Sequence, residues 1–483
     1  MLKMCVEWIF FRTSFNDICM MSQIAVYLHN NSVKRIYMII GVKGFKSIKS
    51  ISNYVIENVN ILAGTNSSGK SSLIQSILLL KQTLESDSKE VLRLDGPYIF
   101  ADSLKDLVYR KVKNIEYDIE LERCEFSENQ QIDTFVDDAE VKSIKIHLSF
   151  SANGTVHLQE ATIILSGVEG KKASLEIRKE KNKQKDTYQV TASNGEILGM
   201  YTIDEVPPLT GCELEFVNFF PTFGEYQGTE KNDKRYFSIP LMKVLKTILE
   251  KKFSNIYYIG PIRVKPALLK NYDMTPSTER VDMDGDNTRY ILQEYKNKKV
   301  ECGKTLAEAI NEWICDKLKL ADAIETSKDA KQLYRTQLKN SKGWKIDLCH
   351  MGFGISQILP ILTQGLLLPK DSLFIVEDPC VHMHPYIQAA MMDFFLEISK
   401  NSECKIIVET HSDHIITRLR RRIAEGLDAR KVNLRFVEQT LEGSIYQKIE
   451  LTNQGAFSER LPNGFLDTHD EDFRAILSSR LKR

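Results

Sequence analysis

The hydrophobic pattern becomes regular at Met38 and first predicts a strand followed by a helix. Residues 38–63 alternate and then become largely apolar over Val59-Asn60-Ile61-Leu62-Ala63, a run that is typical of a buried strand. After a glycine-rich loop, apolar residues recur at helical spacing, at Leu73, Ile74, Ile77, Leu80 and Leu84. This part of the chain is therefore predicted to form a strand, a loop and a helix, in that order.

From residue 115 to residue 235 the pattern changes to short alternating runs, which indicates antiparallel strands. The run over residues 144–150 is followed by Asn153-Gly154 and by a second alternating run. Asn-Gly between two such runs is typical of a β-hairpin. The sequence therefore predicts an antiparallel β insertion in this region.

The rest of the chain predicts helices first and then an α/β alternation. Residues 240–345 are expected to be mainly helical, interrupted by an apolar strand at Ile256–Ile259 and by a loop rich in Asp and Gly around residues 282–286. From residue 346, short apolar strands at 373–376 and 406–408 each precede a helix. The predicted division is a peripheral extension (1–37), an N-terminal lobe (38–114), a β-rich insertion (115–235), a mainly helical subdomain (236–345), a C-terminal lobe (346–430) and a C-terminal strand and tail (431–483).

Length and composition limit the class of protein. A chain of 483 residues is long enough for two or three structural units. Its 65 acidic and 65 basic residues balance, so any contact with nucleic acid must come from a local patch. No uninterrupted apolar stretch approaches about 18 residues, which predicts no transmembrane helix. The nine cysteines form no Cys-x-x-Cys pair, which favours reduced thiols in a cytoplasmic protein over a structural zinc site. For residues 1–37 we expect either a peripheral extension or translation that really starts at Met38.

The strongest chemical signal is the loop between the first predicted strand and helix. It reads Gly-Thr-Asn-Ser-Ser-Gly-Lys-Ser-Ser and matches G-x-x-x-x-G-K-[ST] in full. Such a loop turns backbone N–H groups toward phosphate oxygens and begins a helix whose positive end points at them. A chance Gly-Lys-Ser turn would not be expected between a buried strand and an amphipathic helix. We therefore predict an ATP and Mg²⁺ site, with Lys70 on the β- and γ-phosphates and the Ser71 hydroxyl on the metal. The predicted nucleotide contacts are Gly64, Asn66, Ser67, Ser68, Gly69, Lys70, Ser71 and Ser72.

Two of the later predicted strands end in residues that suit this chemistry. The apolar run 373–376 is followed by Glu377 and Asp378, and we assign Glu377 to the magnesium shell and Asp378 to polarising the attacking water. Strands often finish in charged turns, so this assignment depends on the loop upstream. The run 406–408 leads to His411, which is suited to a hydrogen bond with the γ-phosphate. The alternative for His411 is a histidine satisfied by local backbone.

These motifs, in this order, resemble the ABC-type ATPases of the RecF, SMC and OLD group. The resemblance implies a P-loop NTPase of the ABC-ATPase head type, with an antiparallel β subdomain and a helical signature subdomain. The stretch 351–360 is similar to the group's signature segment, in which Gly354, Ser356 and Gln357 would reach across a dimer to the partner's γ-phosphate. Other matches are Glu377-Asp378-Pro379 at the Walker B position, Val381-His382-Met383-His384-Pro385 with a His-x-His-Pro loop, Thr410-His411-Ser412 with a switch histidine, Tyr258-Ile259-Gly260-Pro261-Ile262-Arg263 with a Gly-Pro-x-Arg element, and Pro462-Asn463-Gly464-Phe465 with the tail of defence-associated bacterial ATPases.

The chain departs from the group's pattern at two positions. Asp378 stands where the group usually has Glu, and Cys380 stands where it usually has another acid. A shorter carboxylate would slow hydrolysis, since a misplacement of about 1 Å can cost on the order of a hundredfold. No Q-loop glutamine can be identified firmly, and Gln82, at the end of the helix after the loop, is only a candidate. His382 and His384 also admit a metal pair, but with no third ligand nearby in sequence we favour a structural loop.

The resemblance implies an ATP-gated homodimer that regulates a separate effector, such as a nuclease encoded nearby, in bacterial anti-phage defence. About 70 residues follow His411, too few for the nuclease domain of OLD proteins. One alternative is a DNA-binding repair ATPase of the RecF kind, for which the run Arg418-Leu419-Arg420-Arg421-Arg422 is the best support, although a solvated face or a set of dimer salt bridges is the commoner role of such arginines. The other is a nucleotide-gated scaffold with negligible turnover, suggested by Asp378. No membrane partner is expected.

Overall fold

In the computed structural model, the described residues are 38–459 and residue 478, apart from short gaps at 87–88, 111, 124–128, 137–138, 154, 182–185, 201–206, 228–233, 266, 271–278, 330–332 and 341. The predictions for residues 1–37 and for the tail at 462–465 lie outside these residues. None of the described helices is both long enough and apolar enough to span a bilayer.

A six-stranded, mostly parallel sheet carries the predicted site. Its strands are β3 (Val59–Gly64), β12 (Ile256–Ile259), β16 (Leu373–Glu377), β17 (Lys405–Thr410), β18 (Val432–Thr440) and β19 (Gly443–Ile449). Their order is β12-β16-β17-β3-β18-β19, and only β19 runs antiparallel to its neighbour. The four buried strands predicted near residues 59–63, 256–259, 373–376 and 406–408 are confirmed.

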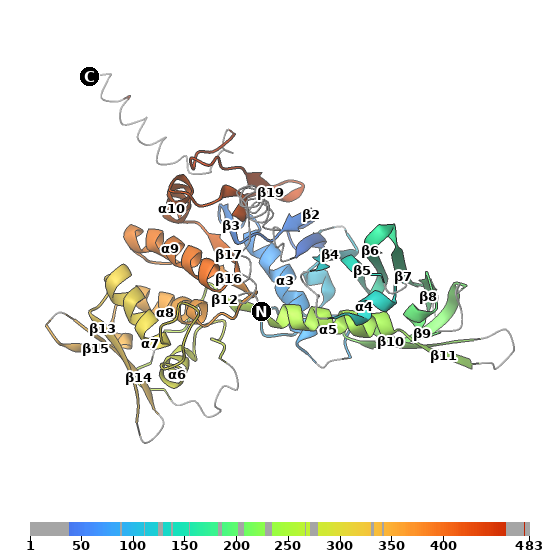
Figure 1. The fold of residues 1–483 in the computed structure, drawn as a ribbon, viewed down its shortest axis with the longest axis horizontal. Coiled ribbons are helices and arrows are strands. Elements are labelled where there is room, and N and C mark those ends of the chain that lie inside the picture. Colours follow the sequence, from blue (N-terminus) through green and yellow to red (C-terminus); the bar gives the residue numbers. More distant parts are fainter. Residues whose placement is uncertain are drawn as a thin grey trace, which may run out of the picture. The chain divides into compact units, whose positions relative to one another are not determined.

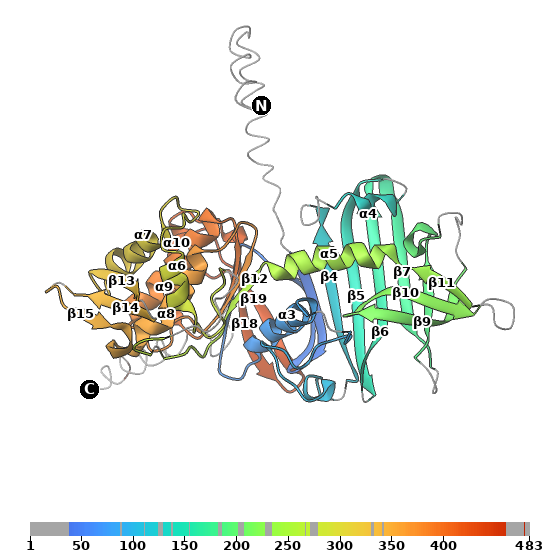
Figure 2. The same ribbon diagram turned by 90° about the horizontal axis from the view of Figure 1, so that it is seen from below.

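Both faces of this sheet are covered, which explains why its strands are apolar without alternation. On β16, Leu373 and Ile375 belong to one hydrophobic core, and Phe374 and Val376 belong to another. The first core includes α3 (Lys70–Leu84) and α5 (Pro240–Ser254), and the second includes α8 (Phe353–Leu366), α9 (Pro385–Asn401) and α10 (Asp413–Ala424). Figures 1 and 2 show these two groups of helices on opposite sides of the sheet.

Two βαβ units place the loops of interest at one edge of the sheet. The chain runs from β16 through α9 to β17, and then through α10 to β18. α10 begins at Asp413, directly after β17 ends at Thr410, whereas a longer loop joins the end of β16 to α9. His384 caps α9 by accepting from the Tyr386 N–H at 3.2 Å, and Ser412 caps α10 by accepting from the Ile415 N–H at 3.3 Å. The carboxyl ends of β3, β16 and β17 therefore open onto a common edge.

The β-rich insertion forms most of a ten-stranded antiparallel sheet with the order β11-β10-β9-β8-β7-β6-β5-β4-β1-β2. The predicted hairpin is confirmed, since the strand Val141–Asn153 pairs antiparallel with Thr155–Gly167. A short helix, α4 (Gln131–Thr134), also lies in this part of the chain. The strands are β1 (Ile39–Phe45), β2 (Ile48–Val55), β4 (Asn114–Glu122), β5 (Val141–Asn153), β6 (Thr155–Gly167), β7 (Lys172–Lys179), β8 (Tyr188–Ala192), β9 (Leu209–Val217), β10 (Phe220–Gln227) and β11 (Lys234–Ser238).

The expectation of mainly helix over residues 236–345 was wrong near its end. After α5, α6 (Thr288–Glu294), α7 (Leu306–Asn311) and a π-helical turn at Glu312–Lys317, the chain forms a three-stranded antiparallel sheet. Its strands are β13 (Ala323–Lys328), β14 (Tyr334–Lys339) and β15 (Lys345–Asp347). Only β14 alternates clearly, with Tyr334, Thr336 and Leu338 buried. Because β13 is mostly exposed and polar, it gives no period-two hydrophobic signal.

Truncation of Phe394 tests how much the second core contributes to stability. This α9 side chain is fully buried, meets the Trp313 ring edge-on at a centroid distance of 4.9 Å and packs over Gly365. Phe394→Ala should lower the free energy of unfolding by about 3–5 kcal/mol in chemical denaturation, because a large cavity cannot collapse between two helices. The exposed Phe100→Ala is the control, expected within about 0.5 kcal/mol of the parent. Similar values for the two variants would contradict this packing account.

Candidate functional site

The loop from β3 to α3 has the backbone conformation that its glycines predict. Ser67 and Gly69 have positive φ angles of 59° and 101°, so left-handed residues alternate with their neighbours as in anion-binding nests. A Cβ on Gly64 would lie 2.2 Å from the Val437 carbonyl oxygen, and one on Gly69 would lie 2.0 Å from Ser444 Oγ. Only glycine fits at these two positions. The loop is followed at once by α3, whose N-cap Gly69 provides no side-chain cap and accepts at its carbonyl from the Ser72 N–H at 3.0 Å.

Two side chains of the C-terminal strand β19 hydrogen-bond to the backbone of this loop. Ser444 Oγ donates to the Ser68 carbonyl at 2.7 Å, and Tyr446 OH donates to the Gly69 carbonyl at 2.5 Å. On the other side, Ser47 Oγ lies 2.8 Å from Ser72 Oγ. Because these contacts join the loop to segments that are distant in sequence, no local pattern could have indicated them.

Lys70 lies at the centre of the loop. Its Nζ donates to the backbone carbonyls of Gly64 at 3.2 Å and Thr65 at 2.8 Å, and the residue is only 3% exposed. Burial lowers the pKa of Lys70, while the nearby carboxylates of Glu409 and Asp378 raise it. Lys70 therefore faces the acidic end of the sheet.

That acidic end includes a residue that sequence analysis did not assign. Glu409, near the end of β17, is paired in register with Glu377 on β16. Ser71 Oγ donates to Glu409 Oε1 at 2.9 Å, whereas Glu409 Oε2 is buried and has no hydrogen-bond partner among the described residues. Burial, followed by the charge of Glu377, raises the pKa of Glu409 to about 8. The sequence feature that could have indicated Glu409 is a charged residue at the end of an apolar run, just before His411.

Glu377 and Asp378 are held by the Gly-Pro-x-Arg element. Tyr258 OH donates to Glu377 Oε1 at 2.8 Å, and burial raises the pKa of Glu377. The Arg263 guanidinium donates to the backbone carbonyls of Glu377 at 2.6 Å and Asp378 at 3.3 Å. Asp378 has a positive φ of 40° and its N–H donates to the Glu409 carbonyl at 2.9 Å, so a strained turn directly follows β16. Burial lowers the pKa of Arg263 to about 10.

His411 lies beside the loop, as the sequence suggested. It is hydrogen-bonded to the Gly64 backbone, and desolvation followed by the charge of Lys70 lowers its pKa. The structure thus brings Lys70, Ser71 and His411 together with the acids of β16 and β17 at one edge of the sheet. Its partner Gly64 is distant in sequence, so the contact is not the local backbone contact given as the alternative for His411.

The signature segment lies elsewhere. In both views α8 is apart from α3 (Figures 1 and 2). Gly352 is exposed and caps α8, and a Cβ on Gly354 would come within 3.0 Å of Met383 Sδ. Ser356 and Gln357 are buried, at 6% and 1% exposure, so the accessible part of this segment is the N-terminal end of α8.

The structure changes the candidate role of Gln82 and gives His384 a structural role. Gln82 is buried and holds a nearby loop, since its amide donates to the Arg93 and Ile99 carbonyls and accepts from the Tyr98 and Ile99 N–H groups. Its side chain is therefore committed to the fold and does not serve as a Q-loop glutamine. His384 acts as a helix cap, and among the described residues no group of three or more His, Cys, Asp or Glu side chains could hold a metal by themselves.

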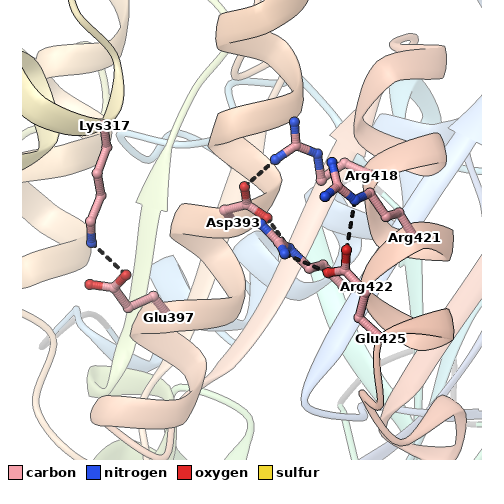
Figure 3. A network of polar contacts seen from close by, with 7 residues as sticks. All are labelled: Lys317, Asp393, Glu397, Arg418, Arg421, Arg422 and Glu425. Atoms are coloured by element: carbon pink, nitrogen blue, oxygen red, sulfur yellow. Dashed lines mark hydrogen bonds and ion pairs between the residues drawn. The ribbon is translucent and has the colours of Figure 1, made fainter.

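The arginine run on α10 is engaged within the chain (Figure 3). Arg418 and Arg422 both pair with Asp393 of α9, and Arg421 pairs with Glu425 at 2.8 Å. Arg420 donates to the Gly455 carbonyl and stacks on the Phe457 ring at 4.1 Å. These contacts are consistent with a set of salt bridges for the run, although the Arg421 side chain remains 61% exposed.

Glu409 should make folding stability depend on pH. Its pKa is about 8 in the folded chain against 4.5 ordinarily, so between these values the folded chain keeps a proton that the unfolded chain releases. Stability therefore falls as pH rises through this window. The side chain of Glu409→Gln cannot ionise, so this variant lacks that pH-dependent loss. Between about pH 5.5 and 8, denaturant titrations should show that its free energy of unfolding falls less than that of the parent, by on the order of 1–3 kcal/mol. An equal loss in the two proteins would contradict the assigned burial.

Comparisons with known proteins give a family. The model of the AAA ATPase domain family matches residues 38–416, which is more than half of the chain. No curated protein matches the sequence significantly.

Similar solved structures include three heads of SMC proteins. An SMC head bound to the C-winged helix domain of ScpA is 12% identical with a TM-score of 0.44, covering 86% of this chain and 98% of that one. The SMC head domain from Thermotoga maritima is 14% identical with a TM-score of 0.36, covering 86% and 100%. A Pyrococcus furiosus Smc head with an extended coiled coil, bound to the C-terminal domain of ScpA, is 12% identical with a TM-score of 0.42, covering 92% and 98%.

The family match covers β3, the glycine-rich loop, both acidic strand ends and His411, whereas Ser444 and Tyr446 of β19 lie beyond it. The chain belongs to the AAA ATPase domain family and is an ATPase.

Proposed function

We propose that the β3–α3 loop binds ATP with magnesium, and that the chain acts as an ATP-gated dimer. Gly64, Asn66, Ser67, Ser68, Gly69, Lys70, Ser71 and Ser72 would hold the phosphates, with Ser71 and Glu377 in the magnesium shell. Asp378 would orient and polarise the attacking water, and His411 would contact the γ-phosphate. Magnesium, when bound, supplies positive charge that offsets the charge developing on the phosphates.

The observation that carries this proposal is a set of unsatisfied polar atoms around a positive centre. Ser68 Oγ and Glu409 Oε2 are buried without hydrogen-bond partners among the described residues, although such atoms are normally paired. Ser68 precedes the buried Lys70 in the same loop, and Glu409 interacts with the charge of Lys70. The phosphate oxygens would accept from the Ser68 hydroxyl and the Lys70 ammonium. The divalent cation would pair with the Glu409 carboxylate oxygen, so the residues fit this ligand.

Replacement of Lys70 tests the nucleotide site directly. Lys70→Ala removes a buried cation and should weaken ATP binding at least about a hundredfold, since a charge-assisted contact is worth roughly 3 kcal/mol. The measurement is calorimetric titration of the purified chain with ATP and Mg²⁺. Lys43→Ala, which removes an exposed lysine on β1, is the matched control and should bind as the parent does. If Lys70→Ala also binds as the parent does, the loop is not the phosphate site.

The position of α8 supports the dimeric part of the proposal. Its N-terminal end carries the exposed Gly352 and the half-buried Gly354, and α8 lies apart from α3 of the same chain (Figures 1 and 2). The N-terminus of a helix suits a phosphate group. In a head-to-tail dimer this end, with Ser356 and Gln357 behind it, would complete the γ-phosphate site of the second copy.

Blocking hydrolysis should therefore trap a dimer. Asp378→Asn removes the proposed base while keeping the side-chain shape, and ATP turnover should fall by about 10²–10⁴-fold with binding retained. With ATP and Mg²⁺, light scattering coupled to gel filtration should show a persistent dimer for Asp378→Asn and a largely monomeric parent after turnover. The exposed Glu438→Gln on β18 serves as the control. A monomeric Asp378→Asn at saturating ATP would contradict dimer gating and leave nucleotide binding intact.

The proposal extends to a separate effector controlled in trans, as in bacterial anti-phage systems. Its support is the resemblance to the RecF, SMC and OLD group, which includes such ATPases. DNA binding through α10 is not proposed, because its arginines are paired with Asp393 and Glu425 in the same chain.

A further inference from the structure

We propose that Glu409 is a third acidic residue of the magnesium–ATP site, and that its free carboxylate oxygen belongs to the magnesium shell. This inference rests on the proposed function, since it concerns the same loop. It assigns a role on β17 beyond those of Glu377 and Asp378 on β16.

Strand order places Glu409 closer to the loop than Glu377. In the sheet, β17 lies between β16 and β3, and Glu409 is in register with Glu377 on one side and with Leu62 on the other. Neighbouring strands are separated by about 4.8 Å. Glu409 is therefore on the strand next to the one that enters the loop, and Glu377 is one strand further away.

The Ser71 hydroxyl identifies the position of the metal. In the P-loop motif this hydroxyl is a magnesium ligand. Here it donates to Glu409 Oε1 at 2.9 Å. Ser71 also interacts with Glu377, so the expected ligand lies between the two acids, and the hydroxyl hydrogen bond at 2.9 Å goes to Glu409.

The second carboxylate oxygen of Glu409 is available. Glu409 is 5% exposed, and Oε2 has no hydrogen-bond partner in the part of the chain that the structure describes. Leaving a buried carboxylate oxygen unpaired is costly, and a divalent cation with oxygen ligands removes that cost. Glu377, by comparison, has one oxygen bonded to Tyr258. Among the described residues, Glu409 Oε2 is the carboxylate oxygen of this pair that is buried without a hydrogen-bond partner.

The substitution Glu409→Gln distinguishes a role in binding the metal from a role that only orients Ser71. If Glu409 only oriented Ser71, then Glu409→Gln would preserve its function, because the amide oxygen of glutamine still accepts from the hydroxyl. If Glu409 serves the metal, the loss of negative charge would weaken the coupling between magnesium and nucleotide.

The experiment titrates Mg²⁺ against binding of the fluorescent analogue mant-ATP to the full chain. For Glu409→Gln, the Mg²⁺ concentration that gives half-maximal binding should rise about 10–100-fold, while binding in EDTA stays within about twofold of the parent or tightens. Glu438→Gln, an exposed glutamate on β18 of the same sheet, should match the parent in both conditions. Circular dichroism and thermal unfolding check that each variant is folded.

The outcomes separate this inference from the proposed function. A Glu409→Gln protein with the parent's Mg²⁺ dependence overturns the role of Glu409, while Lys70→Ala still reports on the loop. Failure of the parent to bind mant-ATP overturns both. Should Glu409→Gln not fold, Glu409→Asp keeps the charge but shortens the side chain by one methylene. A tenfold or greater rise in the required Mg²⁺ then supports the inference, and an unchanged requirement overturns it.

Discussion

The parallel register of β16, β17 and β3 determines the geometry of the site. Glu377 is paired with Glu409, and Thr410 is paired with Ala63, one residue before Gly64. Because the three strands run in the same direction, their carboxyl ends meet at one edge, and residues more than 300 positions apart become neighbours there. Any shift in this register would separate the acids from the loop, whatever the loop's own conformation.

Without a ligand, this edge of the sheet holds buried carboxylates close together, which is electrostatically unfavourable. The pKa values of Glu377 and Glu409 are raised by burial, and Lys70 is the buried cation between them and the loop. Tyr258 and Ser71 each donate one hydrogen bond to this pair. Proteins tolerate such crowding of like charges mainly where function requires it. The arrangement is what we expect of a site that takes up a cation together with a polyanion.

The sequence predicted the loop, the helix after it and the buried strands, because these depend on local residue types and on apolar runs. Two parts could not be predicted in this way. Glu409, Ser444 and Tyr446 reach the loop through strand pairing across more than 300 residues. The β13–β15 sheet was missed because β13 is mostly exposed. The Q-loop role suggested for Gln82 could not be tested from its position on the helix, because sequence does not show that its amide hydrogen-bonds to a nearby loop.

The most direct test is a structure of the full chain with Mg²⁺ and a non-hydrolysable ATP analogue. The account predicts phosphate oxygens within about 3.2 Å of the backbone N–H groups of residues 66–71, with Lys70 Nζ moved from the Gly64 and Thr65 carbonyls onto the phosphates. A nucleotide bound elsewhere, or a Lys70 side chain that keeps both carbonyl contacts while nucleotide is bound, would contradict it.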